Sequence, residues 1–187
     1  MIDEAFILEI LKKCIEAKEK VQAEFSELTS LQLNWRPSVN SWSIGQCLDH
    51  LIISDCLYFP VFQKIKDGDF KMSFWENRNP LGGFFGKLLA TQINEIPNKK
   101  LNAPKIFNPS QSNIDQEIFI RFNKHLDSLL NYITGCKKLD IDKINITSPV
   151  SKVVTYSLRK AIAIIIQHLH RHIYQALKVK AMKEFPL

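Results

Sequence analysis

The chain has 187 residues, of which 45% are hydrophobic and 24% are charged, a composition that is ordinary for a globular protein and excludes a chain that is disordered throughout. Its formal net charge of +6 permits an anionic partner, but the basic residues are spread along the sequence without interleaved aromatics, so we expect no nucleic-acid partner. The longest aliphatic run, Ala161 to Ile166, is far shorter than the roughly 20 residues of a membrane-spanning helix, so we expect no membrane association.

The first predicted helix lies within residues 1–36, a window without glycine or proline. Its apolar residues recur three, four or seven positions apart, which predicts one buried stripe. The members of this stripe are Ile7, Leu11, Cys14, Val21, Phe25 and Leu28.

Near its start the chain carries the acidic pair Asp3-Glu4, where a secretory signal would be basic, so we expect a cytoplasmic protein.

The second predicted helix begins near Ser43 and continues to about Tyr58. The Ser43 hydroxyl can accept a hydrogen bond from a backbone N–H of the first turn while the Gln46 side chain reaches back, as in a capping box. The apolar stripe of this helix consists of Ile44, Leu48 and Leu51.

A long connection follows the second helix. Of the 6 glycines and 8 prolines, nine lie between Pro60 and Pro109. We expect a short extra helix over Leu81 to Ile93 and an irregular segment over Asn98 to Ser110. Aromatic side chains crowd this connection and either pack the loop against the helices or roof a substrate pocket; they are Phe74, Trp75, Phe84 and Phe85.

Two further helices are predicted in the C-terminal half. The third covers about Asn113 to Thr134, with Gly135 just past its end, and its inward residues are Ile118, Phe122, Leu129 and Ile133. The fourth starts near Thr155 or Ser157 and ends before Pro186, with Leu158, Ala161, Ile162, Ile165 and Leu169 on one side.

These patterns predict an all-α protein. Four amphipathic helices without a convincing strand are typical of a four-helix bundle, and residues 1–187 show no internal repeat or second domain. The connection between helices two and three is long enough to return along the roughly 30 Å length of a 20-residue helix. We therefore expect helices two and three to run parallel, in an up-down-down-up order.

Two histidines, His168 and His172, lie four residues apart on the fourth helix, so both rings project from one face. The stripe through Ile165 and Ala161 continues onto this face, which directs the rings inward. Each buried ring brings a donor and an acceptor that need partners, and one divalent cation would satisfy both acceptors. His50, on the second helix, is the natural third ligand.

Other metal chemistries do not fit these residues. Leu169 stands where the zincin motif needs a glutamate, and no histidine has a glutamate three residues before it, as di-iron carboxylate bundles require. Three histidines with one open coordination position are typical of a catalytic site. Histidines satisfied in the core by hydrogen bonds are the alternative.

Several neighbouring residues stay open as site candidates. Cys47 lies one turn before His50, although an isolated cysteine in a helix stripe is more often a core residue. His125 either approaches the core or lies at its edge, and we expect His170 to face solvent. Asp49 and Asp55 lie near the predicted ligands, but a general base needs geometry that the sequence does not supply.

The four cysteines, Cys14, Cys47, Cys56 and Cys136, include no Cys-x-x-Cys pair. This spacing argues against both a disulfide scaffold and a zinc ribbon. We expect reduced thiols, most of them buried.

Two segments resemble the DinB-like superfamily. The first reads Trp35-Arg36-Pro37 and then Trp42-Ser43-Ile44-Gly45-Gln46-Cys47-Leu48-Asp49-His50-Leu51, similar to the segment that opens the second helix in that superfamily. The second, His168-Leu169-His170-Arg171-His172-Ile173-Tyr174-Gln175, is similar to its fourth-helix pattern His-x-x-x-His-x-x-Gln. Ile173 and Tyr174 stand where relatives more commonly have Arg and Gly.

The resemblance implies an up-down-down-up four-helix bundle, often a homodimer, in which His50, His168 and His172 hold a divalent metal ion. Nickel or zinc is the first expectation, with iron or manganese as alternatives. Some relatives are S-transferases for a low-molecular-weight thiol such as bacillithiol, and others are grouped with metal-dependent hydrolases.

We expect a metal-dependent enzyme that acts on a small-molecule substrate, either as a thiol S-transferase or as a hydrolase. A metal ion lowers the pKa of a bound water or thiol, and either becomes a nucleophile near neutral pH. The alternative is a stress-associated helix bundle that binds a ligand or partner and catalyses nothing.

Overall fold

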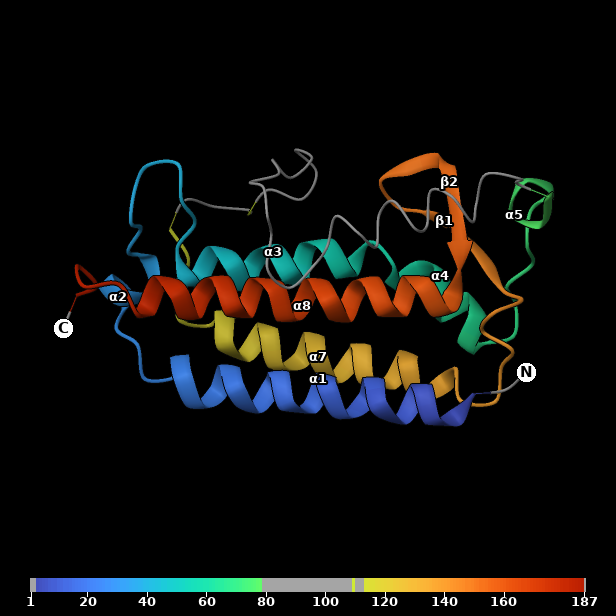
Figure 1. Cartoon of the computed structure of the whole chain (residues 1–187), viewed down its shortest axis with the longest axis horizontal. Coiled ribbons are helices and arrows are strands. Elements are labelled where there is room, and N and C mark those ends of the chain that lie inside the picture. The colour runs from blue at the N-terminus through green and yellow to red at the C-terminus, as the bar shows by residue number, and fades with distance from the viewer. Residues whose placement is uncertain (1–2, 79–108, 110–112, 187) are drawn as a thin grey trace.

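The computed structural model describes residues 3–78, 109 and 113–186 (Figure 1). Four long helices lie along its longest axis: α1 (Glu4–Phe25), α3 (Ile44–Cys56), α7 (Ile118–Gly135) and α8 (Leu158–Lys180). The shorter elements are α2 (Ser30–Asn34), α4 (Phe59–Lys66), α5 (Phe74–Arg78), β1 (Asn145–Ser148) and β2 (Ser151–Ser157). The described chain is mostly helical, in agreement with the predicted class.

The first predicted helix is divided in two. α1 begins after Asp3, whose carboxylate accepts a 3.0 Å hydrogen bond from the Phe6 N–H, and it ends at Phe25. Thr29 and Gln32 then form a capping box that starts α2. The predicted stripe is buried except for a half-buried Leu11; its buried members are Ile7, Cys14, Val21, Phe25 and Leu28.

The predicted capping box of α3 is present. The Ser43 hydroxyl accepts from the Gln46 N–H, and the Gln46 side-chain oxygen accepts from the Ser43 N–H, both over 3.1 Å. Gly45 lies where this first turn approaches the segment before α7. A Cβ atom at that position would come within 2.9 Å of the Ile114 Cβ, so the close packing depends on glycine.

The third predicted helix begins later than expected, at Ile118, and Gly135 is its last residue. All four predicted inward residues are buried, and Leu126 and His125 are buried as well. The fourth predicted helix begins at Leu158, with the Ser157 hydroxyl accepting from the Lys160 N–H at its start. This confirms the second of the two starting points that the sequence left open.

The expectation of no strand is wrong, because β1 and β2 pair as an antiparallel hairpin. The hairpin is held by the segment after α4: the Glu76 carboxylate accepts a 2.9 Å hydrogen bond from the Thr147 N–H, and the Trp75 indole N–H donates to the Val153 carbonyl over 3.2 Å. A two-stranded hairpin gains its stability from such tertiary contacts, which the strand sequence alone does not reveal.

The core is formed between the long helices. α3 packs against α7 and α8, and α1 packs against the same two helices. The inward side chains of all four helices belong to one continuous apolar core.

No helix in the described part of the chain is both long and apolar enough to cross a membrane. The predictions for Leu81 to Ile93 and for Asn98 to Ser110, apart from Pro109, concern residues outside the described part, as do those for Phe84 and Phe85.

Candidate metal centre

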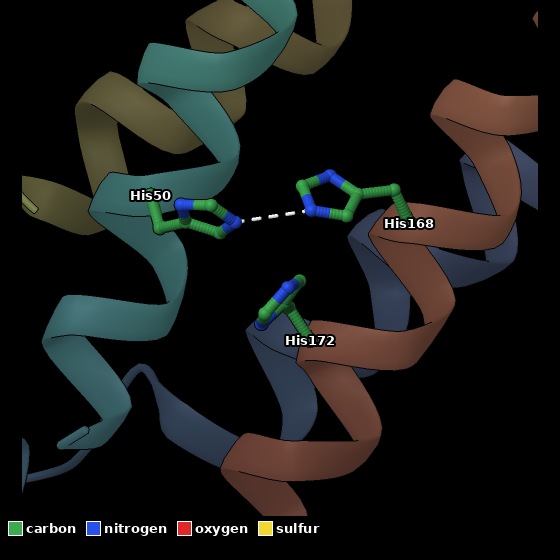
Figure 2. Close-up of side chains that lie close together, drawn as sticks. All are labelled: His50, His168 and His172. Carbon is green, nitrogen blue, oxygen red and sulfur yellow. Dashed lines mark hydrogen bonds between the residues drawn. The ribbon is translucent and has the colours of Figure 1, made fainter. Parts of the chain in front are cut away.

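Three histidine side chains meet between α3 and α8. α3 carries His50, and α8 carries His168 and His172 one turn apart, with their rings directed toward His50 (Figure 2). One ring nitrogen of each lies within 4.8 Å of the other two. Within residues 3–78, 109 and 113–186, this is the one group of three potential metal ligands. The structure thus brings together the three residues that the sequence singled out.

The spacing of the rings suits a shared ion. The Nε2 atoms of His50 and His168 are 3.0 Å apart, and the three ring centroids are separated by 4.4 to 4.9 Å. Nitrogens bound to one zinc ion at about 2.0–2.1 Å and tetrahedral angles lie about 3.4 Å from one another. The His50–His168 separation is close to that value, and the nitrogen of His172 lies within 4.8 Å of both.

Ser54 determines which nitrogen of His168 carries the proton. Its hydroxyl donates to the His50 carbonyl over 2.8 Å and lies 3.5 Å from the His168 Nδ1. Because the single hydroxyl proton is used on the carbonyl, the oxygen accepts from His168, whose proton therefore lies on Nδ1. The lone pair is then on Nε2, the nitrogen that faces His50. This is the tautomer that metal binding through Nε2 requires.

His172 contributes an unsatisfied polar atom to the cluster. Its Nδ1 is buried and has no hydrogen-bond partner among the described residues. A buried polar atom without a partner costs about 1–3 kcal/mol. The His172 imidazole thus retains bonding capacity that a cation can use.

The cluster is electrostatically suited to a cation because its two rings on α8 stay neutral. Burial, together with the neighbouring His50 and Arg171, lowers the pKa of His168 to about 3. Burial and the other two rings lower the pKa of His172 well below its ordinary value, against an opposing contribution from Gln175. Neutral imidazole is the form that binds metal. The one proton shared by the Nε2 atoms of His50 and His168 has to move when an ion binds both.

Trp42 forms one wall of the cluster. Its ring centroid lies 4.6 Å from that of His50 and 5.5 Å from that of His172, and it is stacked on the latter at an angle of 29°. The half-buried indole covers two of the three imidazoles from the side of the loop before α3. It limits their rotation and their contact with water.

The remaining candidates do not belong to the ligand group. Cys47 is fully buried, and burial raises the pKa of its thiol, which disfavours the thiolate that a metal would bind. His125 and Asp55 are buried and bonded to each other on the α3–α7 side. Asp49 is also buried. His170 is half-buried, with its Nε2 enclosed, so the expectation that it faces solvent is wrong.

Sequence reasoning did not identify Ser54 or the position of Trp42 in this site. Ser54 follows His50 by four residues, so the helical period places both on one face of α3, and this signal was present in the sequence. Trp42 precedes the helix, and its orientation depends on how the loop packs. Periodicity carries no information about that packing.

Comparison with protein families gives one match. Residues 15–176 match the DinB superfamily. No match was found among curated proteins or among solved structures. The matched segment covers most of the 187 residues and contains all three histidines of the cluster, and the chain therefore belongs to the DinB superfamily.

Proposed function

We propose that this protein is a metal-dependent enzyme in which His50, His168 and His172 hold one divalent ion, with nickel or zinc as the first candidates and iron or manganese as alternatives. The observation that carries the proposal is the convergence of three imidazoles from two helices, with one ring nitrogen of each within 4.8 Å of the other two. His50 and His172 are buried, and His168 is half-buried. Three protein ligands leave a coordination position open, which is typical of catalytic rather than structural metal sites.

The surrounding residues prepare the ligands for this role. Ser54 holds the His168 tautomer by accepting from Nδ1, and Trp42 packs on two of the rings. When bound, the ion lowers the pKa of a water or thiol in the open position and supplies a nucleophile near neutral pH. The protein keeps the ligands neutral and excludes water from most of their surface.

We propose a small-molecule substrate and one of two reactions, S-transfer from a low-molecular-weight thiol or hydrolysis. Both use a nucleophile generated in the open position and differ in its identity. Membership of the DinB superfamily supports a metal-dependent activity without choosing between them. We also infer an up-down-down-up bundle; in support, α1 starts at the end of the bundle where β2 leads into α8, and α8 ends at the other end, where α2 lies (Figure 1).

Metal analysis and activity assays test the proposal together. Purified protein is dialysed against Ni²⁺ or Zn²⁺, and bound metal is measured by mass spectrometry for the wild type, His172→Ala and His170→Ala. His170 is the matched control, since it lies on the same helix outside the ligand group. We expect one ion per chain in the wild type and in the control, and loss of the ion in His172→Ala.

Each loaded protein is then assayed for conjugation of a thiol to a chromogenic electrophile and for hydrolysis of a chromogenic ester. We expect turnover in one assay, and we expect it to disappear in His172→Ala. Equal metal content in wild type and His172→Ala would contradict the metal site. Full metal loading without turnover in either assay would contradict the enzyme and support a binding protein.

A further inference from the structure

A second group of reactive residue types lies on another face of α3. Cys56, the last residue of this helix, is exposed, whereas the other three cysteines are buried. Its Sγ lies 3.9 Å from the Nδ1 of His125 on α7. The opposite ring nitrogen of His125 lies 3.1 Å from an Asp55 carboxylate oxygen. Thiol, imidazole and carboxylate are therefore arranged in sequence from the surface inward.

The inner part of this group is fixed by packing. The His125 and Asp55 side chains are only 3% and 2% exposed. The Phe59 ring is stacked on His125 at 5.2 Å and 17°, which holds the imidazole plane. Since Nε2 is engaged by the carboxylate, Nδ1 is the nitrogen presented to the thiol. In enzymes with a cysteine nucleophile, a neighbouring base activates the cysteine and a third group orients that base. Cys56, His125 and Asp55 are arranged in this way.

The buried pair retains a proton at neutral pH. Burial alone would lower the pKa of His125, but its hydrogen bonds to Asp55 and Cys56 outweigh burial and raise that pKa to about 9. Burial raises the pKa of Asp55, against the effect of His125. Cys14, on α1, and Tyr58, just after α3, are further titratable groups that interact with Asp55. An imidazolium beside a thiol favours the thiolate, the nucleophilic form.

We propose that Cys56, His125 and Asp55 form a thiol–disulfide exchange site that takes small disulfides. The Cys56 thiol releases its proton to water beside the protonated His125, and the thiolate attacks one sulfur of a disulfide RSSR. A new S–S bond forms between Cys56 and one RS group, and the original S–S bond breaks. The electron pair leaves with the other RS group, which takes up the proton as RSH. Cys56 is oxidised to a mixed disulfide while half of the small disulfide is reduced, so no further oxidant is required.

The other thiols provide internal controls. Cys14, Cys47 and Cys136 are buried, and burial raises the pKa of all three, to about 12 for Cys14 and about 11 for Cys136. Neither access nor ionisation favours their reaction in the folded chain. One fast-reacting thiol per chain is therefore expected.

The test is the rate of reaction with the chromogenic disulfide DTNB in the folded, full-length protein. The reference thiol is Ala23→Cys in a Cys56→Ser background, which places an exposed cysteine near the C-terminal end of α1, as Cys56 is at the end of α3. At pH 6.5 an isolated thiol is about 1% ionised. A neighbouring imidazolium favours the reactive form of a thiol, whereas a more acidic thiol is a weaker nucleophile. We expect Cys56 to react about ten times faster than the reference.

Two variants test whether Cys56 reacts quickly because His125 and Asp55 activate it or only because it is exposed. Asp55→Asn keeps an acceptor for His125 and removes the charge, and His125→Gln removes the imidazole. Both should reduce the Cys56 rate at pH 6.5 to that of the reference thiol, and the rate should then rise with pH as for an ordinary thiol. Cys56→Ser should abolish the fast phase.

A Cys56 rate equal to the reference at pH 6.5 would overturn the proposal, as would folded Asp55→Asn and His125→Gln proteins that react like the wild type. Circular dichroism and thermal melting establish folding. If neither variant folds, the pH profile of wild-type Cys56 against the reference decides: a flat profile from pH 6 to 8 supports the exchange site, and a profile parallel to the reference refutes it.

Discussion

Ser54→Ala tests how the metal ligands are positioned. The hydroxyl of Ser54 is the group that accepts from the His168 Nδ1 in the described structure. In the variant, nothing keeps the proton of His168 on Nδ1, and the ring loses the constraint that directs the Nε2 lone pair toward His50. The variant otherwise loses only local hydrogen bonds within α3, from the Ser54 hydroxyl to the carbonyls of His50 and Leu51.

The size of the effect follows from the geometry. Removing a group that orients a metal-ligating histidine typically costs 10- to 100-fold in metal affinity. The Ser54–His168 contact of 3.5 Å is long for a hydrogen bond. We therefore expect the lower end of this range, a loss of about tenfold, which corresponds to about 1.4 kcal/mol.

The assay is competition for Zn²⁺ with a chromogenic chelator, and the chain offers a matched control. Ser128, on α7, also donates to the carbonyl four residues before it, over 3.0 Å, but it lies outside the cluster. Ser128→Ala should bind zinc like the wild type, whereas Ser54→Ala should bind about tenfold more weakly. Equal affinities for Ser54→Ala and the wild type would refute the role of this hydroxyl.

Three further predictions concern the cluster and its support. Because the Trp42 ring lies 5.5 Å from that of His172, Ni²⁺ should quench tryptophan fluorescence and saturate at one ion per chain; an unchanged quench in Trp42→Phe would contradict this. Burial depresses the pKa of His168 and His172, so metal-free stability should be lost as pH falls below about 6.5, by about 2 kcal/mol per ring at pH 5; urea denaturation that gives a flat profile would contradict neutral rings. Gly45→Ala should lower the free energy of unfolding by about 1–3 kcal/mol, because its Cβ would meet Ile114 at 2.9 Å; an unchanged melting temperature would contradict the close packing.

The sequence predicted the helices that carry the site because these helices have strong local signals. The capping box of Ser43 and Gln46 is a local pattern, and it appears in the structure as expected. The inward face of α8 also follows from its apolar period. The i, i+4 spacing of His168 and His172 then placed both rings on that face.

The sequence was less informative where structure depends on distant contacts. The hairpin was missed because the contacts that hold it, such as the Glu76 carboxylate on Thr147, come from a segment about 70 residues earlier in the chain. The half-buried state of His170 likewise depends on what covers α8, which the helical wheel does not contain. The direction of His125 was left open because two registers of the α7 stripe were compatible with the sequence; in the structure His125 contacts Asp55 rather than the cluster.

The most direct test of the central claim is X-ray absorption spectroscopy of the zinc-loaded protein. We expect three imidazole ligands and at least one light, non-histidine ligand, all at about 2.0–2.1 Å, with fewer imidazoles or no bound zinc in His172→Ala. A sulfur ligand at about 2.3 Å, or a wild-type spectrum with fewer than three imidazoles, would contradict it.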